Sequence, residues 1–585
     1  MFLKYLRKYW LQIAALLVGL GLQVWSSLAL PEYMANIINN GIMNGQKDAI
    51  WQEGVRMLGV AAVGGVGMVI AGFFASYIGS NLAKNLRDDV FAKVLSFGIN
   101  EIDNFSTASL ITRTTNDITQ IQQVTIMTLR MILQAPLMAV GAIFQAFRTA
   151  PSMSWIMWLA VAALLVCIIA AMVIALPKFK LTQKATDKLN QLARENLTGL
   201  RVIRAFNGEK REEKRFNGAN QELAGLNFFT GITMGTVFPI VSIIMKLVPL
   251  LIVWVGAHRI IESGLMIGDM LAFMQYAMQV IMSFMFLSFG FIMVPRGVVS
   301  WKRLAEVLGT NSKVKFVKSS VKTAENLETT APLLQFSNVS YAYNGAEEMA
   351  ISKITFELAA GETLAIIGGT GAGKTTILNL IMRFFDATEG EVLLSGASVK
   401  NLSESDLSDK IGFVPQKNLL FAGTVRENMK LGNDKITDAE IKKALANSMS
   451  DDFLKEKEGL ETPVAQNGAN FSGGQKQRLC IARALAKNPE LLIFDDSFSA
   501  LDLKTDAAVR ENLGKHYKNL AKIIVAQRVN TIKHADKIMV IDGGKVVGFG
   551  EHFSLLKSNA TYREITRSQF SEDEYAEEIR KAHNA

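Results

Sequence analysis

The chain has 585 residues, half of them hydrophobic, and a formal net charge of +9 at pH 7. A single domain seldom exceeds about 300 residues, so this length indicates more than one domain. The apolar residues gather in the first half, which is typical of a membrane protein, and a basic cytoplasmic side then explains the positive charge without a nucleic-acid partner. The two cysteines, Cys167 and Cys480, provide neither a disulfide framework nor the spacing of a metal site.

The N-terminus superficially resembles a secretory signal, because Lys4, Arg7 and Lys8 precede an apolar run. This run, from residue 11 to about residue 38, is too long for a signal and ends in no small-residue cleavage site. We therefore predict that it is a retained spanning helix.

Apolar runs of about 20 residues, long enough to cross about 30 Å of hydrocarbon, predict six transmembrane helices. They lie near residues 11–38, 55–80, 126–148, 153–176, 230–257 and 267–294. The connections 81–125 and 177–229 are long and polar, and lysines after the fourth span place them and both termini in the cytoplasm. Their three- and four-residue apolar spacing predicts that the spanning helices continue into the cytoplasm. The turns in these connections are candidate levers on the second half of the chain.

Two features of the spans are candidates for a transport pathway. Methionines recur every four residues along one face of the last span, at Met270, Met274, Met278 and Met282. Such a flexible surface suits varied hydrophobic ligands, but it is equally typical of helix and lipid packing. Lys246 lies deep in the fifth span, where a charge must face a cavity or a partner unless the span ends at a shallower position.

Polar residues then indicate a linker at 311–332, which separates a transmembrane domain at 1–310 from a soluble domain at 333–570. Alternating strand and helix patterns predict that this soluble domain is α/β. The charged tail at 571–585 is predicted to be a peripheral helix, and no chemistry is evident in it.

A glycine-rich stretch between a predicted buried strand and a predicted helix matches the pattern G-x-x-x-x-G-K-[ST]. Its residues are Gly368, Gly369, Thr370, Gly371, Ala372, Gly373, Lys374 and Thr375, and Thr376 follows. Glycines let backbone N–H groups turn toward phosphate oxygens, and the helix presents its positive end to the same anion. The pattern predicts that Lys374 reaches the terminal phosphates and that the Thr375 hydroxyl ligates Mg²⁺. Alone it indicates only a nucleotide site, and a fortuitous glycine turn is the alternative.

Two later stretches carry further polar groups. The residues Phe471, Ser472, Gly473, Gly474 and Gln475 precede a helical pattern. They form either a second anion-recognition surface or an ordinary capped helix. Asp495 and Asp496 end a buried apolar strand, where an aspartate beside a phosphate loop holds Mg²⁺ and orients a water.

In order along the chain come the phosphate loop, Gln416 in FVPQ, the FSGGQ stretch, LLIFDD and SALD. This ordered set resembles the nucleotide-binding domain of ATP-binding cassette (ABC) transporters. The six spans ahead of it are similar to the exporter type, so the resemblance covers nearly the whole chain. It implies an all-α six-helix transmembrane domain followed by an α/β P-loop domain, ATPase activity coupled to transport, and ATP and Mg²⁺ as cofactors.

The resemblance also implies roles for single residues. Tyr343 would stack on adenine, Asp495 would hold Mg²⁺, and Gln416 would contact Mg²⁺ and the surroundings of the attacking water. The stretch Ser472, Gly473, Gly474 and Gln475 would hold the γ-phosphate of a nucleotide bound by the opposite subunit, with Asp502 at the same interface. The segments SLITRTTNDITQIQ and ENLTGLRVIRAF resemble those that flank coupling turns in this family.

Two positions depart from the family pattern. Asp496 stands where a glutamate usually serves as catalytic base, and a carboxylate shorter by one methylene can cost about a hundredfold in rate. Gln527 stands at the switch histidine, and glutamine can donate a hydrogen bond but cannot become cationic. A softer departure is Gln466, where exporters often carry glutamate.

The departures resemble those of the degenerate-site subunit of a heterodimeric multidrug exporter, which is the subunit whose own ATP site binds ATP but hydrolyses it poorly. This resemblance implies export of hydrophobic compounds across a plasma membrane that is bacterial. The predicted partners are a second half-subunit and membrane lipid, and no nucleic acid is expected. A homodimer with two slow sites, a lipid or peptide exporter, an ATP-gated channel and a soluble ATPase acting on nucleic acid are the alternatives.

Overall fold

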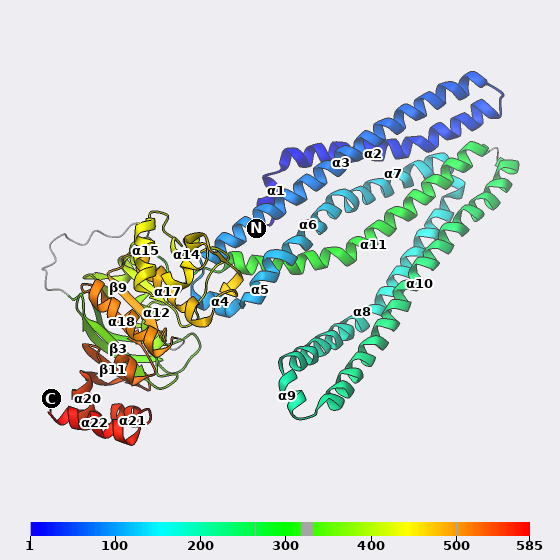
Figure 1. Cartoon of the computed structure of the whole chain (residues 1–585). Coiled ribbons are helices and arrows are strands. Elements are labelled where there is room, and N and C mark those ends of the chain that lie inside the picture. The colour runs from blue at the N-terminus through cyan, green and yellow to red at the C-terminus, as the bar shows by residue number, and fades with distance from the viewer. Residues whose placement is uncertain (1, 264, 318–331, 499–500, 585) are drawn as a thin grey trace. The chain divides into compact units, whose positions relative to one another are not determined.

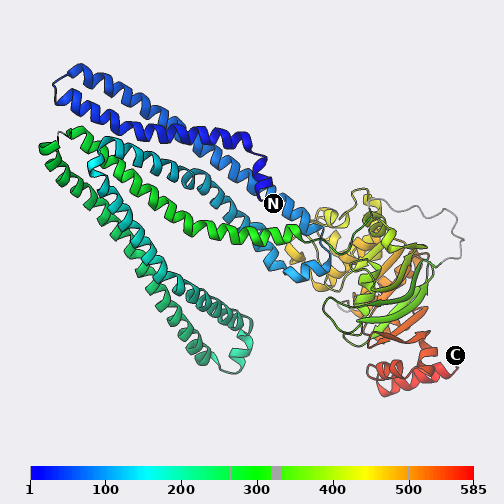
Figure 2. The ribbon, with the colours of Figure 1, turned by 180° about the vertical axis from the view of Figure 1, so that it is seen from behind.

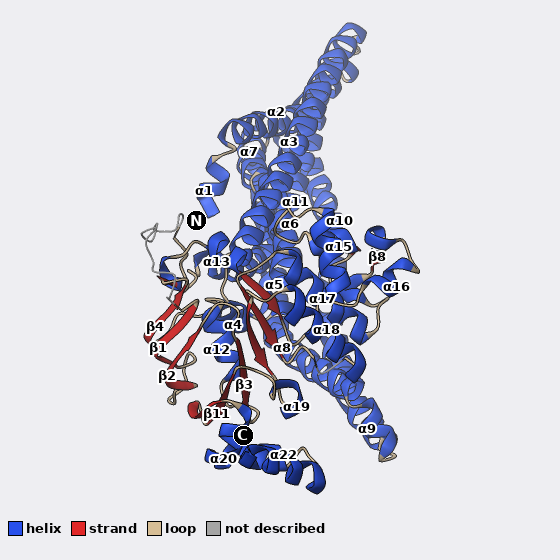
Figure 3. Cartoon of the chain, turned by 60° about the vertical axis from the view of Figure 1, so that its left-hand side comes forward, coloured by secondary structure: helices blue, strands red, loops and turns tan. Residues whose placement is uncertain are grey.

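A computed structural model of the chain describes residues 2–263, 265–317, 332–498 and 501–584. They form two compact units, Met1–Leu95 with Ser106–Thr310, and Ser96–Phe105 with Asn311–Ala585. The first unit is helical, and the strands all belong to the second (Figure 3). Residues 96–105 therefore group with the soluble domain, although we assigned them from the sequence to the transmembrane domain. Most of the predicted linker lies outside the described residues.

Within the described residues, six helical segments are long and apolar enough to cross a membrane. They are Trp10–Ile42, Lys47–Leu95, Thr107–Thr149, Pro151–Thr198, Glu209–Ile261 and Ile267–Gly309. Each contains one predicted apolar run, so the prediction of six spans is confirmed. Several segments continue for many residues past the apolar run, as the helical spacing of the polar connections predicts.

The helices of the first unit follow the chain order shown in Figure 1. They are α1 (Phe2–Arg7), α2 (Trp10–Asn36), η1 (Ile37–Ile42), α3 (Lys47–Leu95), α5 (Thr107–Thr112), η2 (Arg113–Asp117), α6 (Ile118–Met127), η3 (Thr128–Ile132), α7 (Gln134–Thr149), η4 (Pro151–Met153), α8 (Ser154–Thr198), α9 (Leu200–Ala205), α10 (Glu209–Ser263) and α11 (Ile267–Gly309). Short π-helical turns at η2 and η3 divide the third span, while the other long helices are nearly continuous.

Helices α2 and α3 lie side by side in both Figure 1 and Figure 2 because small residues let their backbones approach. A Cβ atom at Gly67 would lie 2.7 Å from the carbonyl oxygen of Gly19, and one at Gly19 would lie 2.9 Å from that of Gly67. About two helical turns away, the Ser26 hydroxyl donates a hydrogen bond of 2.7 Å to the carbonyl oxygen of Val60. Close packing and a hydroxyl bond thus join the first two spans.

Helices α8 and α10 form a second hairpin, closed by the short helix α9 (Figure 2). Lys188 of α8 and Glu222 of α10 form an ion pair of 3.0 Å along it. None of the α9 residues is buried, and the Phe206 side chain just after the helix is 82% exposed. An apolar tip therefore ends a hairpin whose sides are polar.

The second unit is built on a six-stranded sheet with the order β12-β11-β3-β10-β9-β6 and a four-stranded sheet with the order β2-β1-β4-β5. The strands are β1 (Leu334–Tyr341), β2 (Ile351–Leu358), β3 (Thr363–Gly368), β4 (Glu389–Leu394), β5 (Ala397–Ser398), β6 (Ile411–Val414), β7 (Gly423–Thr424), β8 (Pro463–Val464), β9 (Leu491–Asp495), β10 (Ala521–Val525), β11 (Lys537–Asp542) and β12 (Lys545–Gly550). Strands β11, β3, β10, β9 and β6 are parallel, so their carboxyl ends meet at one edge. The predicted α/β class is confirmed.

Helices surround these sheets. They are α4 (Ile99–Phe105), α12 (Lys374–Ile381), η5 (Val399–Asn401), α13 (Glu404–Lys410), α14 (Val425–Met429), α15 (Asp438–Asn447), α16 (Asp451–Lys455), η6 (Gly459–Glu461), η7 (Gln466–Gly468), α17 (Gly473–Ala486), α18 (Leu503–His516), α19 (Val529–Ile532), α20 (His552–Ser558), α21 (Ala560–Arg567) and α22 (Glu572–Asn584). Strand β9 is buried along its whole length and β3 along its middle four residues, which explains their nearly continuous apolar runs.

Helix α4, the turn of the first long connection, packs within the second unit. Glu101 is only 5% exposed, and its carboxylate accepts backbone hydrogen bonds from Gly98 at 3.0 Å and from Lys313 at 3.4 Å. Ile99 packs against an apolar core cluster that includes residues of both sheets. One of the two candidate levers thus belongs to the second unit.

The close approach of α2 and α3 gives a stability prediction. We expect Gly67→Ala to destabilise the protein by about 1–3 kcal/mol, because the added methyl group would overlap the backbone of α2. Gly65→Ala is the matched control, since a Cβ there meets nothing within 4 Å and alanine favours helix. Thermal unfolding of both variants in detergent tests this, and an equal melting temperature for the two would contradict it.

Candidate nucleotide site

The phosphate loop joins β3 to α12 at the carboxyl edge of the large sheet. Gly371 and Gly373 have φ angles of +82° and +100°, which side chains with a Cβ rarely adopt. A Cβ on Gly373 would also lie 2.6 Å from the Ile351 side chain. By contrast, the positions of Gly369 and Gly371 open onto free space. The loop is therefore a backbone cradle with an open side, as the sequence pattern predicts.

The Lys374 side chain lies over this cradle. Its Nζ donates hydrogen bonds to the carbonyl oxygens of Gly368 at 2.9 Å and Gly369 at 2.7 Å. Burial lowers the pKa of Lys374, and the charges of Asp496 and Asp495 oppose this effect. The ammonium group is thus held where phosphate oxygens can replace the two carbonyl oxygens.

Asp495 ends β9 and is 6% exposed. Burial and repulsion from Asp496 raise its pKa, whereas a hydrogen bond with Thr375 lowers it. Thr375 itself is exposed in the first turn of α12, and Gln416 is exposed in the loop after β6. A carboxylate, a hydroxyl and an amide oxygen are hard donors of the kind that Mg²⁺ takes, so these residues fit the ion.

The two positions that depart from the family pattern touch each other. The Gln527 side-chain amide donates a hydrogen bond of 3.2 Å to the carboxylate of Asp496. Asp496 has a φ of +50°, and its backbone N–H donates to the Val525 carbonyl at 2.9 Å. Burial raises the pKa of Asp496, while Lys374 and Arg528 lower it. A carboxylate and an amide therefore occupy the position where the family has its base and its switch.

Tyr343 lies beside the helix that follows the phosphate loop. Its hydroxyl is 3.0 Å from the Thr376 hydroxyl, and its ring meets those of Tyr341 and Phe385 edge-on at 5.1 and 5.7 Å between centroids. The side chain is still 40% exposed. Its position next to α12 is compatible with the predicted stacking on adenine.

The residues of the FSGGQ stretch, hereafter the signature, form a helix cap within this chain. The Ser472 hydroxyl accepts from the Gln475 N–H at 3.3 Å, and the Ser472 N–H donates to the Gln475 side chain at 3.0 Å. Ser472 and Gly473 are exposed, so this surface also remains open to an anion. Asp502 caps α18 by accepting from the Thr505 N–H at 2.9 Å, and these backbone bonds hold the pKa of Asp502 below its usual value. Ser499 and Ala500 lie outside the described residues.

The predicted pathway residues lie in two different environments. Met270 is buried and occupies the space beside Gly256, and Met274 and Met278 pack against the same apolar cluster. Met282 is partly buried, whereas Lys246 is exposed on α10. Three of the four methionines thus contribute to helix packing, and their role toward cargo stays a prediction.

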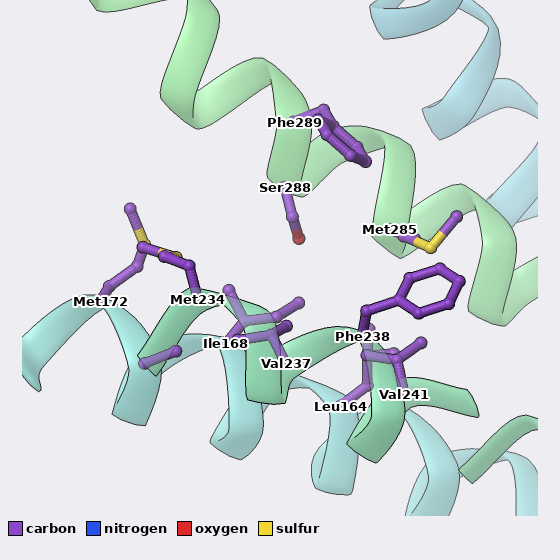
Figure 4. Close-up of a pocket in the computed structure, with 11 residues that line it drawn as sticks. Leu164, Ile168, Met172, Met234, Val237, Phe238, Val241, Met285, Ser288 and Phe289 are labelled. Carbon is purple, nitrogen blue, oxygen red and sulfur yellow. The ribbon is translucent and has the colours of Figure 1, made fainter. Parts of the chain in front are cut away.

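A cavity that the sequence did not reveal lies between α8, α10 and α11 (Figure 4). Its volume is about 230 Å³. Its lining consists of Leu164, Ile168, Ala171, Met172, Met234, Val237, Phe238, Val241, Met285, Ser288 and Phe289. The Ser288 hydroxyl donates to the Phe284 carbonyl at 2.8 Å, so even the polar member of the wall is engaged within its own helix. Nothing in the sequence distinguishes these residues from other apolar span residues.

Comparison with known proteins agrees with this geometry. A family model described as the ABC transporter transmembrane region matches residues 13–284, and one described as ABC transporter matches residues 351–499. An uncharacterized ABC transporter ATP-binding protein of Mycobacterium tuberculosis is 33% identical over 97% of both chains. The uncharacterized ABC transporter ATP-binding protein YfiB of Bacillus subtilis is 30% identical over 98% of both.

Two further similarities concern proteins with more specific names. The ATP-dependent lipid A-core flippase of Albidiferax ferrireducens is 27% identical over 97% of both chains. A solved structure of a bacterial Atm1-family ABC exporter with ATP bound has a TM-score of 0.74 and 23% identity, covering 96% of this chain and 99% of the other. This structural similarity shows the fold alone.

The phosphate cradle, the buried aspartate and the parallel sheet define an ATP-binding domain, joined in one chain to six spanning helices. The chain belongs to the ABC transporters, and its architecture is that of an ABC exporter. It is a multi-pass membrane protein that binds ATP and couples ATPase activity to transport. ABC exporters function as dimers, so a second half completes the working protein.

The buried and closely spaced carboxylates of Asp495 and Asp496 lead to a prediction about stability. Because the pKa of Asp495 is raised, the folded state binds more protons than the unfolded state, and stability falls as the pH rises through the raised pKa. We expect Asp495→Asn to raise the melting temperature without nucleotide at neutral pH by about 2–4 °C, the shift that about 1 kcal/mol gives. The same variant should lose the stabilisation conferred by Mg²⁺ and ATP.

Asp502→Asn is the matched control for this prediction. The pKa of Asp502 is lowered by hydrogen bonds, so its ionised form does not cost folding free energy, and asparagine caps helices well. Thermal unfolding between pH 5 and 8 checks both variants. A melting temperature for Asp495→Asn at or below that of the unchanged protein would contradict the prediction.

Proposed function

We propose that this chain is the degenerate-site half of a heterodimeric exporter of hydrophobic compounds. The observation that carries the proposal is the hydrogen bond between Gln527 and Asp496. A general base must accept a proton from water, and this carboxylate is one methylene shorter than glutamate and already accepts a bond from the amide. Glutamine cannot supply the positive charge of a histidine cation. The site should therefore bind ATP and hydrolyse it slowly.

Binding of nucleotide uses groups that are already in position. Lys374 exchanges its two loop carbonyls for phosphate oxygens, and the glycine cradle donates backbone N–H groups to them. Asp495, Thr375 and Gln416 would hold Mg²⁺, which neutralises charge between the phosphates when bound. Tyr343 offers its open ring surface to adenine, and Thr376 fixes the tyrosine hydroxyl.

Several exposed surfaces support a second chain as partner. Ser472 and Gly473 are exposed at the start of α17, and Asp502 is exposed at the start of α18. At the tip of the α8–α10 hairpin the Val202 side chain is 61% exposed and that of Phe206 is 82% exposed. Exposed apolar side chains of this kind are candidates for contact with another protein surface. The signature of this chain would then complete a competent ATP site on a partner that has its own glutamate and histidine.

ATP would drive transport through its different affinity for two arrangements of the dimer. Closure around two nucleotides would turn the pathway from inward- to outward-facing, and hydrolysis at the partner's site would reset it. ATP retained at the slow site would keep the two halves in partial contact between cycles. Parallel loss of nucleotide from both sites during turnover would contradict this retention.

The wall of the α8–α10–α11 cavity supports hydrophobic cargo, because its exposed surface offers hardly any polar group to a ligand. Lipid is the second candidate cargo, because an ATP-dependent lipid A-core flippase is 27% identical to this chain. The acyl chains of a lipid could also pack against the apolar wall of the cavity. We place the protein in a bacterial plasma membrane with both termini in the cytoplasm, on the basis of the lysines after the fourth span and the bacterial sources of its relatives.

ATP turnover by the chain alone and with its co-purifying partner tests the proposed asymmetry. We expect the isolated chain to be nearly silent and the pair to be active. Asp496→Glu and Gln527→His together should raise the activity of the isolated chain by about a hundredfold, because they restore the base and the switch. Strong turnover by the unmodified chain as a homodimer would overturn the degenerate-site assignment.

A substitution that fills the cavity tests the assignment of cargo. Ala171→Trp places a large ring among the lining residues, so we expect at least a tenfold loss of transport of hydrophobic dyes in sealed vesicles while basal ATPase activity is kept. Ala170→Trp is the matched control, because this neighbouring residue is exposed on α8 and is not part of the lining. Equal transport by both variants would exclude the cavity as a cargo site, and selective loss of lipid movement would favour the lipid alternative.

A further inference from the structure

Gln569 bridges two backbone groups on either side of Arg528. Its side-chain amide donates a hydrogen bond of 2.7 Å to the carbonyl oxygen of Gln527. The oxygen of the same amide accepts a bond of 2.8 Å from the N–H of Val529. One side chain thus supplies both a donor and an acceptor, which fixes the direction of the backbone between the end of β10 and the start of α19.

The turn that carries Gln569 is itself held firmly. It follows α21, whose Tyr562 and Thr566 are buried, and Phe570 packs against the apolar core. Ser571 then begins α22 with a reciprocal cap, accepting from the Glu574 N–H at 3.3 Å and donating its own N–H to the Glu574 carboxylate at 3.0 Å. The amide therefore projects from a fixed point of the C-terminal helices.

Helix α22 is joined to the same region by charged groups. Glu578 is buried and pairs with Lys533, just after α19, at 3.4 Å. Its other carboxylate oxygen lies 3.5 Å from the ring of His552, whose Nδ1 is 2.7 Å from the Tyr562 hydroxyl. Helix α22, in the tail for which the sequence indicated no chemistry, thus packs on the segment that follows Gln527.

The segment is also held from the opposite side. Arg510 of α18 donates to the carbonyl oxygen of Thr531 at 2.9 Å and pairs with Asp506. With Gln569 at one end and Arg510 at the other, residues 527–531 have little freedom. The backbone from which the Gln527 side chain reaches Asp496 is therefore held in place by Gln569.

We propose that Gln569 is a positioning residue of the nucleotide site. It orients Gln527 toward Asp496 and the terminal phosphate, and so makes the C-terminal helices part of the apparatus that retains ATP. The proposal rests on the role assigned to Gln527 under the proposed function, but it does not depend on whether the partner is identical or different. It predicts that Gln569 acts on nucleotide only through Gln527.

Release of a photoreactive ATP tests this role in the full-length chain purified with its partner. The complex is loaded with 8-azido-ATP and Mg²⁺ and diluted into ATP, and label remaining on this chain after illumination is followed over time on a gel. Gln569→Ala removes both bonds of the bridge, and we expect it to release the label about fivefold faster, a change of the size that one ordinary hydrogen bond contributes. Gln569→Glu keeps the acceptor for Val529 but loses the donor to Gln527, so an intermediate rate is expected.

A double-mutant cycle with Gln527→Ala separates positioning from general stability. Gln527→Ala alone should speed release as much as Gln569→Ala does, and the double variant should be no faster than either. Glu578→Gln is the matched control, because it weakens the packing of α22 without touching the bridge. We expect it to lower the melting temperature while release stays within about twofold.

The outcomes distinguish the two proposals. If Gln527→Ala speeds release but Gln569→Ala does not, or if the two effects add, positioning by Gln569 is wrong and the proposed function stands. If Gln569→Ala acts while Gln527→Ala is silent, or if both are silent, the positioning role is wrong together with the role given to Gln527. If Glu578→Gln matches Gln569→Ala, the bridge is only structural.

Discussion

The parallel pairing of β10 between β3 and β9 is the constraint on which the nucleotide site depends. Val525, the last residue of β10, is aligned with Ile366 of β3 and with Asp495 of β9. Because the three strands run in the same direction, their carboxyl ends bring the glycine-rich loop, Asp495 and Gln527 to one edge. Asp495 is the last residue of β9, the glycine-rich loop begins at the end of β3, and Gln527 lies two residues past β10, so strand register sets their places.

This arrangement concentrates charge that folding alone would disfavour. Burial lowers the pKa of Lys374 and raises that of Asp495 and Asp496, so each ionised group is less stable here than in water. Their mutual attraction offsets part of this cost. The phosphates of bound ATP would attract the Lys374 ammonium group, so ATP binding can offset more of this cost. The unfavourable burial of these charged groups in the empty site therefore favours binding of the ligand.

The membrane unit solves a different problem, because in lipid the packing of helices cannot rely on the hydrophobic effect. Where α2 meets α3, glycines allow backbone contact and a serine hydroxyl bonds across the interface. Where α8, α10 and α11 diverge, large and flexible side chains leave an apolar cavity. The bundle thus combines close backbone packing between α2 and α3 with a cavity, lined by methionine and phenylalanine side chains, that has room for a ligand.

The sequence by itself determined the class of the protein, and its motifs predicted the residues of the nucleotide site. Hydropathy located all six spans, since crossing a membrane requires a long local run of apolar residues, and the phosphate loop needs its glycines and lysine within eight consecutive positions. The departures at Asp496 and Gln527 were equally visible, because they stand at fixed places in ordered motifs.

Only the tertiary structure decided which distant residues act together. The contact of Gln527 with Asp496, separated by 31 positions, follows from strand register, and the bridge from Gln569 follows from the docking of the C-terminal helices. The grouping of residues 96–105 with the second unit and the burial of Met270 against Gly256 have the same cause. Motifs and spans are properties of neighbouring residues, whereas these contacts arise from surfaces that meet only when the chain is folded.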